Sequence, residues 1–178
     1  MSISSTNGPR EPSQTSRLSA DEKKLALFRQ QKALLDTFLS SRAIKIIKAN
    51  FTRKIFNIFS NYGSLLQIDF SEKKSKGNNI FIYMCNWRIC HDSIELLTSN
   101  DDRTKFDNIF ELLIHDGIEV IDLVFNRENH EFSFYLRNNY SMTIFPNNDS
   151  VTDDMIIFFI EDRQPICYNI QKGFYSGN

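Results

Sequence analysis

The spacing of apolar residues changes near residue 60 of this 178-residue chain, and that change limits the fold more than any motif does. Up to about residue 58, apolar side chains recur every three or four residues, as they do along one face of an α-helix. From Ser64 onward they alternate with polar side chains, which is the two-residue period of a half-buried β-strand. We therefore expect an α+β protein in which N-terminal helices precede an antiparallel sheet.

The helical part begins with a capping signal. Ser19 and Glu22 have the spacing of a capping box, in which each side chain accepts a hydrogen bond from the other residue's backbone N–H. An apolar stripe follows to about Ser40, formed by Leu25, Phe28, Leu35 and Leu39 and widened by Leu27, Leu34 and Phe38. A second helical pattern runs from Ile44 to Ile58, with a stop at 61–63. The β-branched isoleucines within 44–47 also favour a β-strand, so a strand is the alternative structure for these four residues.

The sheet part contains about six to seven strands, interrupted by one helix over 102–115 with Gly117 just past its end. The expected strands are 66–70, 80–89, 118–125, 131–137, 140–145, 155–160 and 166–170. Asn138 and Asn139 suit a tight hairpin turn, because asparagine tolerates a positive φ. A helix and a hairpin occur twice in this order. This predicts two helix-plus-hairpin repeats that form one sheet, with the helices on one side.

Composition sets the domain organisation and the compartment. Residues 1–17 are polar and carry Gly8, Pro9 and Pro12, so we expect a disordered tail. Residues 18–178 then form a single α+β domain, within which 18–43 could be a semi-independent helix. The three cysteines lack the spacing of a disulfide framework, and no apolar stretch is long enough to span a membrane. We expect a cytoplasmic protein with no membrane contact.

Charge is distributed unevenly, although the net charge is only −1. The segment 1–91 contains 15 basic and 6 acidic residues, whereas 92–178 contains 6 basic and 16 acidic residues. Such polarity is typical of contact with a charged partner. The alternative is that the two halves attract each other, or interleave, within one domain.

Each half suggests a different partner. The acidic half suits a basic enzyme, and its candidate contact residues in predicted loops are Asp101, Asp102, Asp149, Asp153 and Asp154. The basic segment 42–54 suits nucleic acid, with candidate residues Arg42, Lys45, Lys48, Arg53 and Lys54 and with Trp87 as a base-stacking side chain. For Trp87, a place in the core is the competing interpretation.

Catalytic and metal-binding patterns are sparse. No phosphate-binding loop or zinc-binding motif is present, and we expect no metal and no cofactor. Cys90 and His91 are neighbours on an expected strand, where successive side chains point to opposite faces. The two side chains could therefore bind one metal ion only if the backbone were irregular there. A metal-dependent nuclease around Asp69 and Glu72 is the remaining catalytic alternative. A solvated hairpin loop explains the same residues.

Two short patterns resemble known families. The helical stretch 24–44, with its Gln30–Asp36 segment and the Arg42-Ala43-Ile44 end, resembles the first part of a SHOCT-type module, without that module's second helix. The pattern of Gln67–Phe70 and Leu123–Phe125, each followed by a loop and an alternating strand, resembles small immunity proteins of bacterial polymorphic-toxin systems. That resemblance implies binding to a toxin partner, and it carries no functional residues.

Together these observations favour a non-enzymatic protein-binding inhibitor of the immunity or anti-defence type, which occupies a basic surface of a partner enzyme. The alternatives are a nucleic-acid-binding protein using 42–54 and the metal-dependent nuclease. The sequence does not specify the oligomeric state.

Overall fold

A computed structural model describes residues 20–55, 58–62, 65–70, 77–146 and 155–177. The chain divides into two compact units, Met1–Leu35 and Asp36–Asn178. The predicted disordered tail, 1–17, and the predicted capping residue Ser19 lie outside the described residues. No helix in the described part of the chain is long and apolar enough to cross a membrane.

One continuous helix, α1 (Ala20–Phe51), replaces the two predicted N-terminal helices. It contains neither glycine nor proline, and it is rich in alanine, leucine and lysine, which favour helix formation. The helix includes 44–47, so the strand alternative there is wrong. It ends at Phe51 rather than near residue 61, because Arg53 has φ 66° and its N–H donates to the Val120 carbonyl at 2.7 Å. A hydrogen bond to a residue 67 positions later in the chain, Val120, thus ends the helix.

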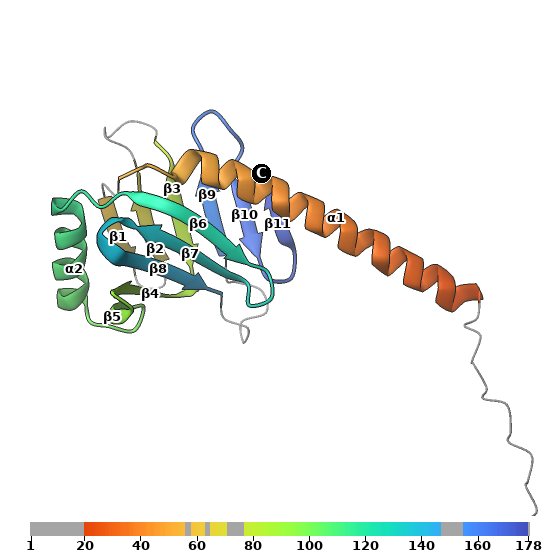
Figure 1. Cartoon of the computed structure of the whole chain (residues 1–178), viewed down its shortest axis with the longest axis horizontal. Helices are drawn as coiled ribbons and strands as arrows, with labels where there is room; N and C mark the ends of the chain where they lie inside the picture. Colours follow the sequence, from red (N-terminus) through yellow and green to blue (C-terminus); the bar gives the residue numbers. More distant parts are fainter. Residues whose placement is uncertain (1–19, 56–57, 63–64, 71–76, 147–154, 178) are drawn as a thin grey trace, which may run out of the picture. The chain divides into compact units, whose positions relative to one another are not determined.

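Two antiparallel sheets contain the strands, so the prediction of α+β architecture with antiparallel sheet is confirmed. The six-stranded sheet contains, in spatial order, β1 (Ile58–Tyr62), β2 (Leu65–Asp69), β3 (Asn79–Tyr83), β9 (Met155–Phe159), β10 (Ile166–Asn169) and β11 (Gly173–Ser176). The five-stranded sheet contains β5 (Ile94–Thr98), β4 (Asn86–His91), β8 (Tyr140–Phe145), β7 (Glu131–Leu136) and β6 (Val120–Asn126). The sheets lie in two layers (Figure 1).

The core lies between these layers. Phe132 of β7 and Phe158 of β9 are both fully buried, and their ring centroids are 5.5 Å apart. Tyr168 of β10 approaches Phe132 to 5.0 Å. Phe51, at the end of α1, contacts Phe158 at 5.8 Å, so the last turn of α1 belongs to the same core. Large apolar side chains from both sheets and α1 therefore hold the layers together.

The prediction of a single sheet is wrong, and the error lies at residues 80–89. This apolar run was expected to be one central strand. It is instead divided between β3 and β4, which belong to different sheets. Met84, at the break, has φ 58°, a left-handed conformation that turns the chain out of one sheet and into the other.

Both predicted hairpins exist, but in different sheets. Strands β2 and β3 pair with Gln67 opposite Phe81, and strands β6 and β7 pair with Leu123 opposite Phe134. The predicted repeat therefore holds for the hairpins and fails for their arrangement in one sheet. Asn138 and Asn139 both have a positive φ, as expected for their turn.

Helix α2 (Arg103–His115) confirms the predicted third helix. Phe106, Phe110 and Leu113 are its buried residues. The helix ends before Gly117, which has φ +58° and whose N–H donates to the Ile114 carbonyl at 3.1 Å. A glycine adopts this conformation without the penalty that a side chain would bring.

Candidate functional site

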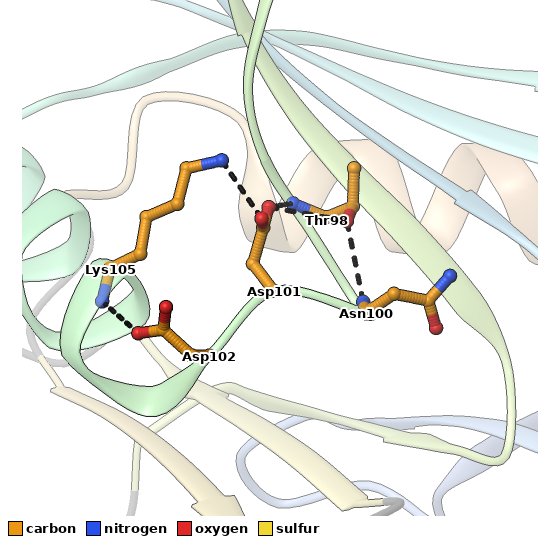
Figure 2. Close-up of polar contacts among 5 residues, drawn as sticks. All are labelled: Thr98, Asn100, Asp101, Asp102 and Lys105. Carbon is orange, nitrogen blue, oxygen red and sulfur yellow. Dashed lines mark hydrogen bonds and ion pairs between the residues drawn. The ribbon is translucent and has the colours of Figure 1, made fainter.

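The loop between β5 and α2 carries two of the predicted partner-binding residues, Asp101 and Asp102, and both carboxylates have structural roles (Figure 2). The Asp101 carboxylate accepts from the Thr98 backbone N–H at 2.7 Å and from its hydroxyl at 3.2 Å. It also pairs with the Lys105 ammonium at 2.9 Å. Asp102 caps α2, because its carboxylate accepts from the Lys105 backbone N–H at 2.9 Å. These two acids build the loop and the helix start.

Asp101 has a lowered pKa. The hydrogen bond from the Lys105 side chain contributes most, followed by the bond from the Thr98 backbone N–H, and both favour the ionised carboxylate over the protonated form. The folded pKa is thus below the ordinary value of 3.8. The resulting stabilisation is present above the unfolded pKa and is lost as the pH falls through the folded one.

This shift leads to a titration prediction. Lys105→Gln should raise the Asp101 pKa back toward 3.8, because it removes the ammonium that pairs with the carboxylate. NMR titration of the Asp101 side-chain carbonyl carbon measures this change. Lys172→Gln, at an exposed lysine of the β10–β11 turn, is the control and should leave the Asp101 titration unchanged. An unaltered Asp101 pKa in Lys105→Gln would contradict the assigned cause.

The cap leads to a stability prediction. Asp102→Ala should lower the free energy of unfolding by about 1 kcal/mol, because one N–H at the start of α2 loses its acceptor. Asp102→Asn keeps a capping side chain and removes the charge, so it should retain most of the stability. Urea denaturation compares the two. Equal losses in both variants would assign the effect to charge rather than to capping.

The remaining predicted acidic contacts, Asp149, Asp153 and Asp154, lie outside the described residues. Of the nuclease pair, Asp69 accepts from the Gln67 side-chain amide at 3.1 Å, and Glu72 also lies outside. Within the described part of the chain, no group of three or more histidine, cysteine or acidic residues is placed to hold a metal ion.

The basic segment 42–54 is partly committed to packing. Lys48 forms an ion pair with Asp122 of β6 at 2.8 Å, and this pairing lowers the Asp122 pKa. Lys48 and Asp122 come from the basic and the acidic half, so at this point the halves do attract each other within the domain. Arg42 borders an apolar cavity of about 180 Å³ between α1 and the strands β10 and β11. Arg42 is nevertheless exposed, as are Lys45, Arg53 and Lys54.

Trp87 belongs to the core. It is 5% exposed, and its ring lies 6.0 Å from the rings of both Phe106 and Phe110 on α2. Its indole face is therefore covered by α2, which excludes it from stacking on a nucleic-acid base in the folded protein. Of the two interpretations of Trp87, the fold agrees with its place in the core.

A different set of acids remains exposed on two elements that contact each other, β5 and α2. Glu95 of β5 and Glu111 of α2 are exposed, and neither makes an ion pair with another described residue. Beside them in the chain, Ile94 is 68% exposed and Leu112 is 42% exposed. We refer to these four exposed residues from the two elements, Ile94, Glu95, Glu111 and Leu112, together as the β5–α2 surface. Exposed apolar side chains with polar residues at their rim are the kind of surface that marks a protein-binding site.

The sequence did not predict this surface, because β5 was not predicted. Residues 94–98 contain one polar position between isoleucine and leucine, followed by the turn-forming stretch 99–102. This short apolar run before a turn was the available signal.

Comparison of the chain with protein-family models, with curated proteins and with solved structures gave no match.

Proposed function

We propose that this chain is a non-enzymatic protein-binding inhibitor of the immunity or anti-defence type, whose acidic half occupies a basic surface of a partner enzyme. The observation that supports the proposal is the β5–α2 surface, where two exposed carboxylates without an ion pair to any described residue neighbour exposed apolar residues in the chain. Apolar contacts of this kind supply affinity, and unpaired acids steer a basic partner into place.

The burial of Trp87 and the pairing of Lys48 favour this proposal over nucleic-acid binding. Base stacking needs an exposed aromatic face, and phosphate binding needs free cations. Two of the six predicted nucleic-acid contacts are thus occupied in the fold. By contrast, Glu95 and Glu111 are exposed and remain available to a partner.

The test compares two variants with the same change in charge. Glu95→Gln with Glu111→Gln neutralises the β5–α2 surface, and Glu128→Gln with Glu161→Gln neutralises two other exposed acids of the acidic half. The wild-type chain captures its partner from cell extract, and the purified partner is then titrated with each variant. We expect association with the surface variant to be about tenfold slower, because steering by charge acts mainly on the association rate.

The inhibitor part of the proposal is tested on the same purified partner, whose enzymatic activity should fall when the wild-type chain is added. Equal association rates for the two variants would contradict the role of the β5–α2 surface. Salt-sensitive binding of the chain to bare DNA or RNA would overturn the function itself, under two conditions. The binding must be lost in the triple variant Lys45→Glu, Arg53→Glu and Lys54→Glu, and it must be retained in the surface variant.

A further inference from the structure

Helix α1 exposes an unusual amount of apolar surface. Seven large apolar side chains between Leu25 and Leu39 have exposed fractions from 42% to 65%. They are Leu25, Leu27, Phe28, Leu34, Leu35, Phe38 and Leu39. Together they expose roughly 700 Å² of apolar side-chain surface per chain, more than the ~300–600 Å² of the largest patch on a typical monomer.

These side chains lie along one broad face of the helix. Leu25, Phe28, Leu35 and Leu39 follow one another at spacings of three, seven and four residues, which keeps them on a single stripe. Leu27, Leu34 and Phe38 lie on the adjoining flank. The opposite side carries Ala26, Gln30, Ala33, Thr37 and Ser40, so it presents small or polar side chains. A helix with one such face has the pattern of a helix that packs on another helix.

The exposed area matches what a second copy of the same helix would bury. A specific interface of standard size buries about 800 Å² on each partner. The apolar face of α1 alone comes close to this figure. Most homo-oligomers have closed two-fold symmetry, in which the same surface patch faces itself.

Charge then selects the direction of the second helix. In a parallel pair, Lys32 near the centre of the face would lie beside Lys32 of the other copy, and Arg29 at its edge would lie beside Lys24. In an antiparallel pair with its two-fold axis between residues 32 and 33, Arg29 lies opposite Asp36 of the other copy. These residues are seven positions apart and so lie on the same edge of the stripe. The antiparallel pair thus replaces like-charge contacts with two Arg29–Asp36 pairs.

We propose that α1 pairs in an antiparallel manner with α1 of a second copy of this chain, through the face containing Phe28, Leu35 and Leu39. Gln31 and Lys32 both lie within this face, and a polar residue inside an apolar helix interface fixes the register of the helices. The proposal does not depend on the inhibitor function, because it rests on α1 and not on the β5–α2 surface.

Sedimentation velocity on the full-length chain tests the proposal, over about 1–100 µM. We expect a dimer of the 20.8 kDa chain at the upper end of this range. Phe28→Gln with Leu35→Gln should make the chain monomeric at every concentration. Ile121→Gln with Tyr135→Gln, at two exposed apolar positions of β6 and β7, is the matched control and should remain dimeric.

The charge pair tests the direction of the helices. Arg29→Glu alone and Asp36→Arg alone should each weaken the dimer, and the double variant should restore it, because the swapped charges attract again only in the antiparallel pair. Circular dichroism shows whether each variant keeps its fold. If the double variant dimerises no more tightly than the single variants, the antiparallel arrangement is overturned.

Two results would overturn the pairing itself. The first is a wild-type chain that stays monomeric at 100 µM. The second is a monomer that binds vesicles of anionic lipid through the same face, with binding lost in Phe28→Gln with Leu35→Gln. Partner binding is measured separately, so a failed dimer leaves the proposed function standing, and a failed inhibitor assay leaves the dimer standing.

Discussion

Phe158→Ala is expected to lower the free energy of unfolding by about 3–5 kcal/mol, a large part of the total stability of an ordinary domain. Phe158 is fully buried and lies where three elements meet. Its ring is 5.5 Å from that of Phe132 in the opposite sheet and 5.8 Å from that of Phe51 at the end of α1. Truncation leaves a cavity between the layers that neither sheet can fill without moving as a whole.

The neighbouring residue Phe159 provides the matched control. It lies on the other face of β9, where it is half-buried and its ring is 4.9 Å from that of Phe81. Phe159→Ala makes the same chemical change on the same strand, and it should cost clearly less because water reaches part of the site. Urea denaturation measures both variants. Equal losses would mean that the space between the sheets does not dominate the stability.

A double-mutant cycle with Phe132 adds a second measurement. Because the two rings are in contact, Phe132→Ala with Phe158→Ala should cost less than the two single changes together, by about 0.5–1.5 kcal/mol. Additive losses would mean that the rings do not interact across the layers. The cycle thus tests the face-to-face arrangement of the sheets.

Local signals predicted the local elements well. The alternation over 140–145 matches β8, and the apolar stripe over 102–115 matches α2 to within one residue. The hairpin β2–β3 also followed from period and loop alone. In each case the residues that decide the structure are neighbours in the sequence, so a short window contains the necessary information.

Long-range contacts decided what the sequence did not predict. The end of α1 depends on a hydrogen bond from Arg53 to Val120, and the division of 80–89 depends on a left-handed Met84. Nothing in the composition of either segment indicates these features. The candidate site shows the same limit, since Asp101 and Asp102 were chosen as exposed loop acids, and the fold uses both of them to build the start of α2. A loop position predicts exposure, and it does not show whether a carboxylate already has partners.

Trp87→Ala is expected to cost about 3–5 kcal/mol, because it removes the side chain on which α2 packs. The Trp87 indole lies 6.0 Å from Phe106 and from Phe110, and these two rings are 4.1 Å from each other. Trp87→Phe keeps an aromatic ring in this cluster and should lose less than half as much. Denaturation curves for the two variants measure the difference. A loss below about 1 kcal/mol in Trp87→Ala would contradict the packing of α2 on β4.

Trp87 is the only tryptophan of the chain, so its fluorescence follows this site directly. At 5% exposure, its emission should be that of an indole in an apolar environment and should shift to longer wavelength on unfolding. Adding single-stranded DNA or RNA at low salt should leave the native emission unchanged, because no base can reach the ring. Quenching of the native signal by nucleic acid, reversed by added salt, would mean that α2 opens and that Trp87 has a place in nucleic-acid recognition. An unchanged signal would leave the exposed cations of the basic segment, Arg42, Lys45, Arg53 and Lys54, as the predicted contacts, and stacking on Trp87 would contribute nothing to binding.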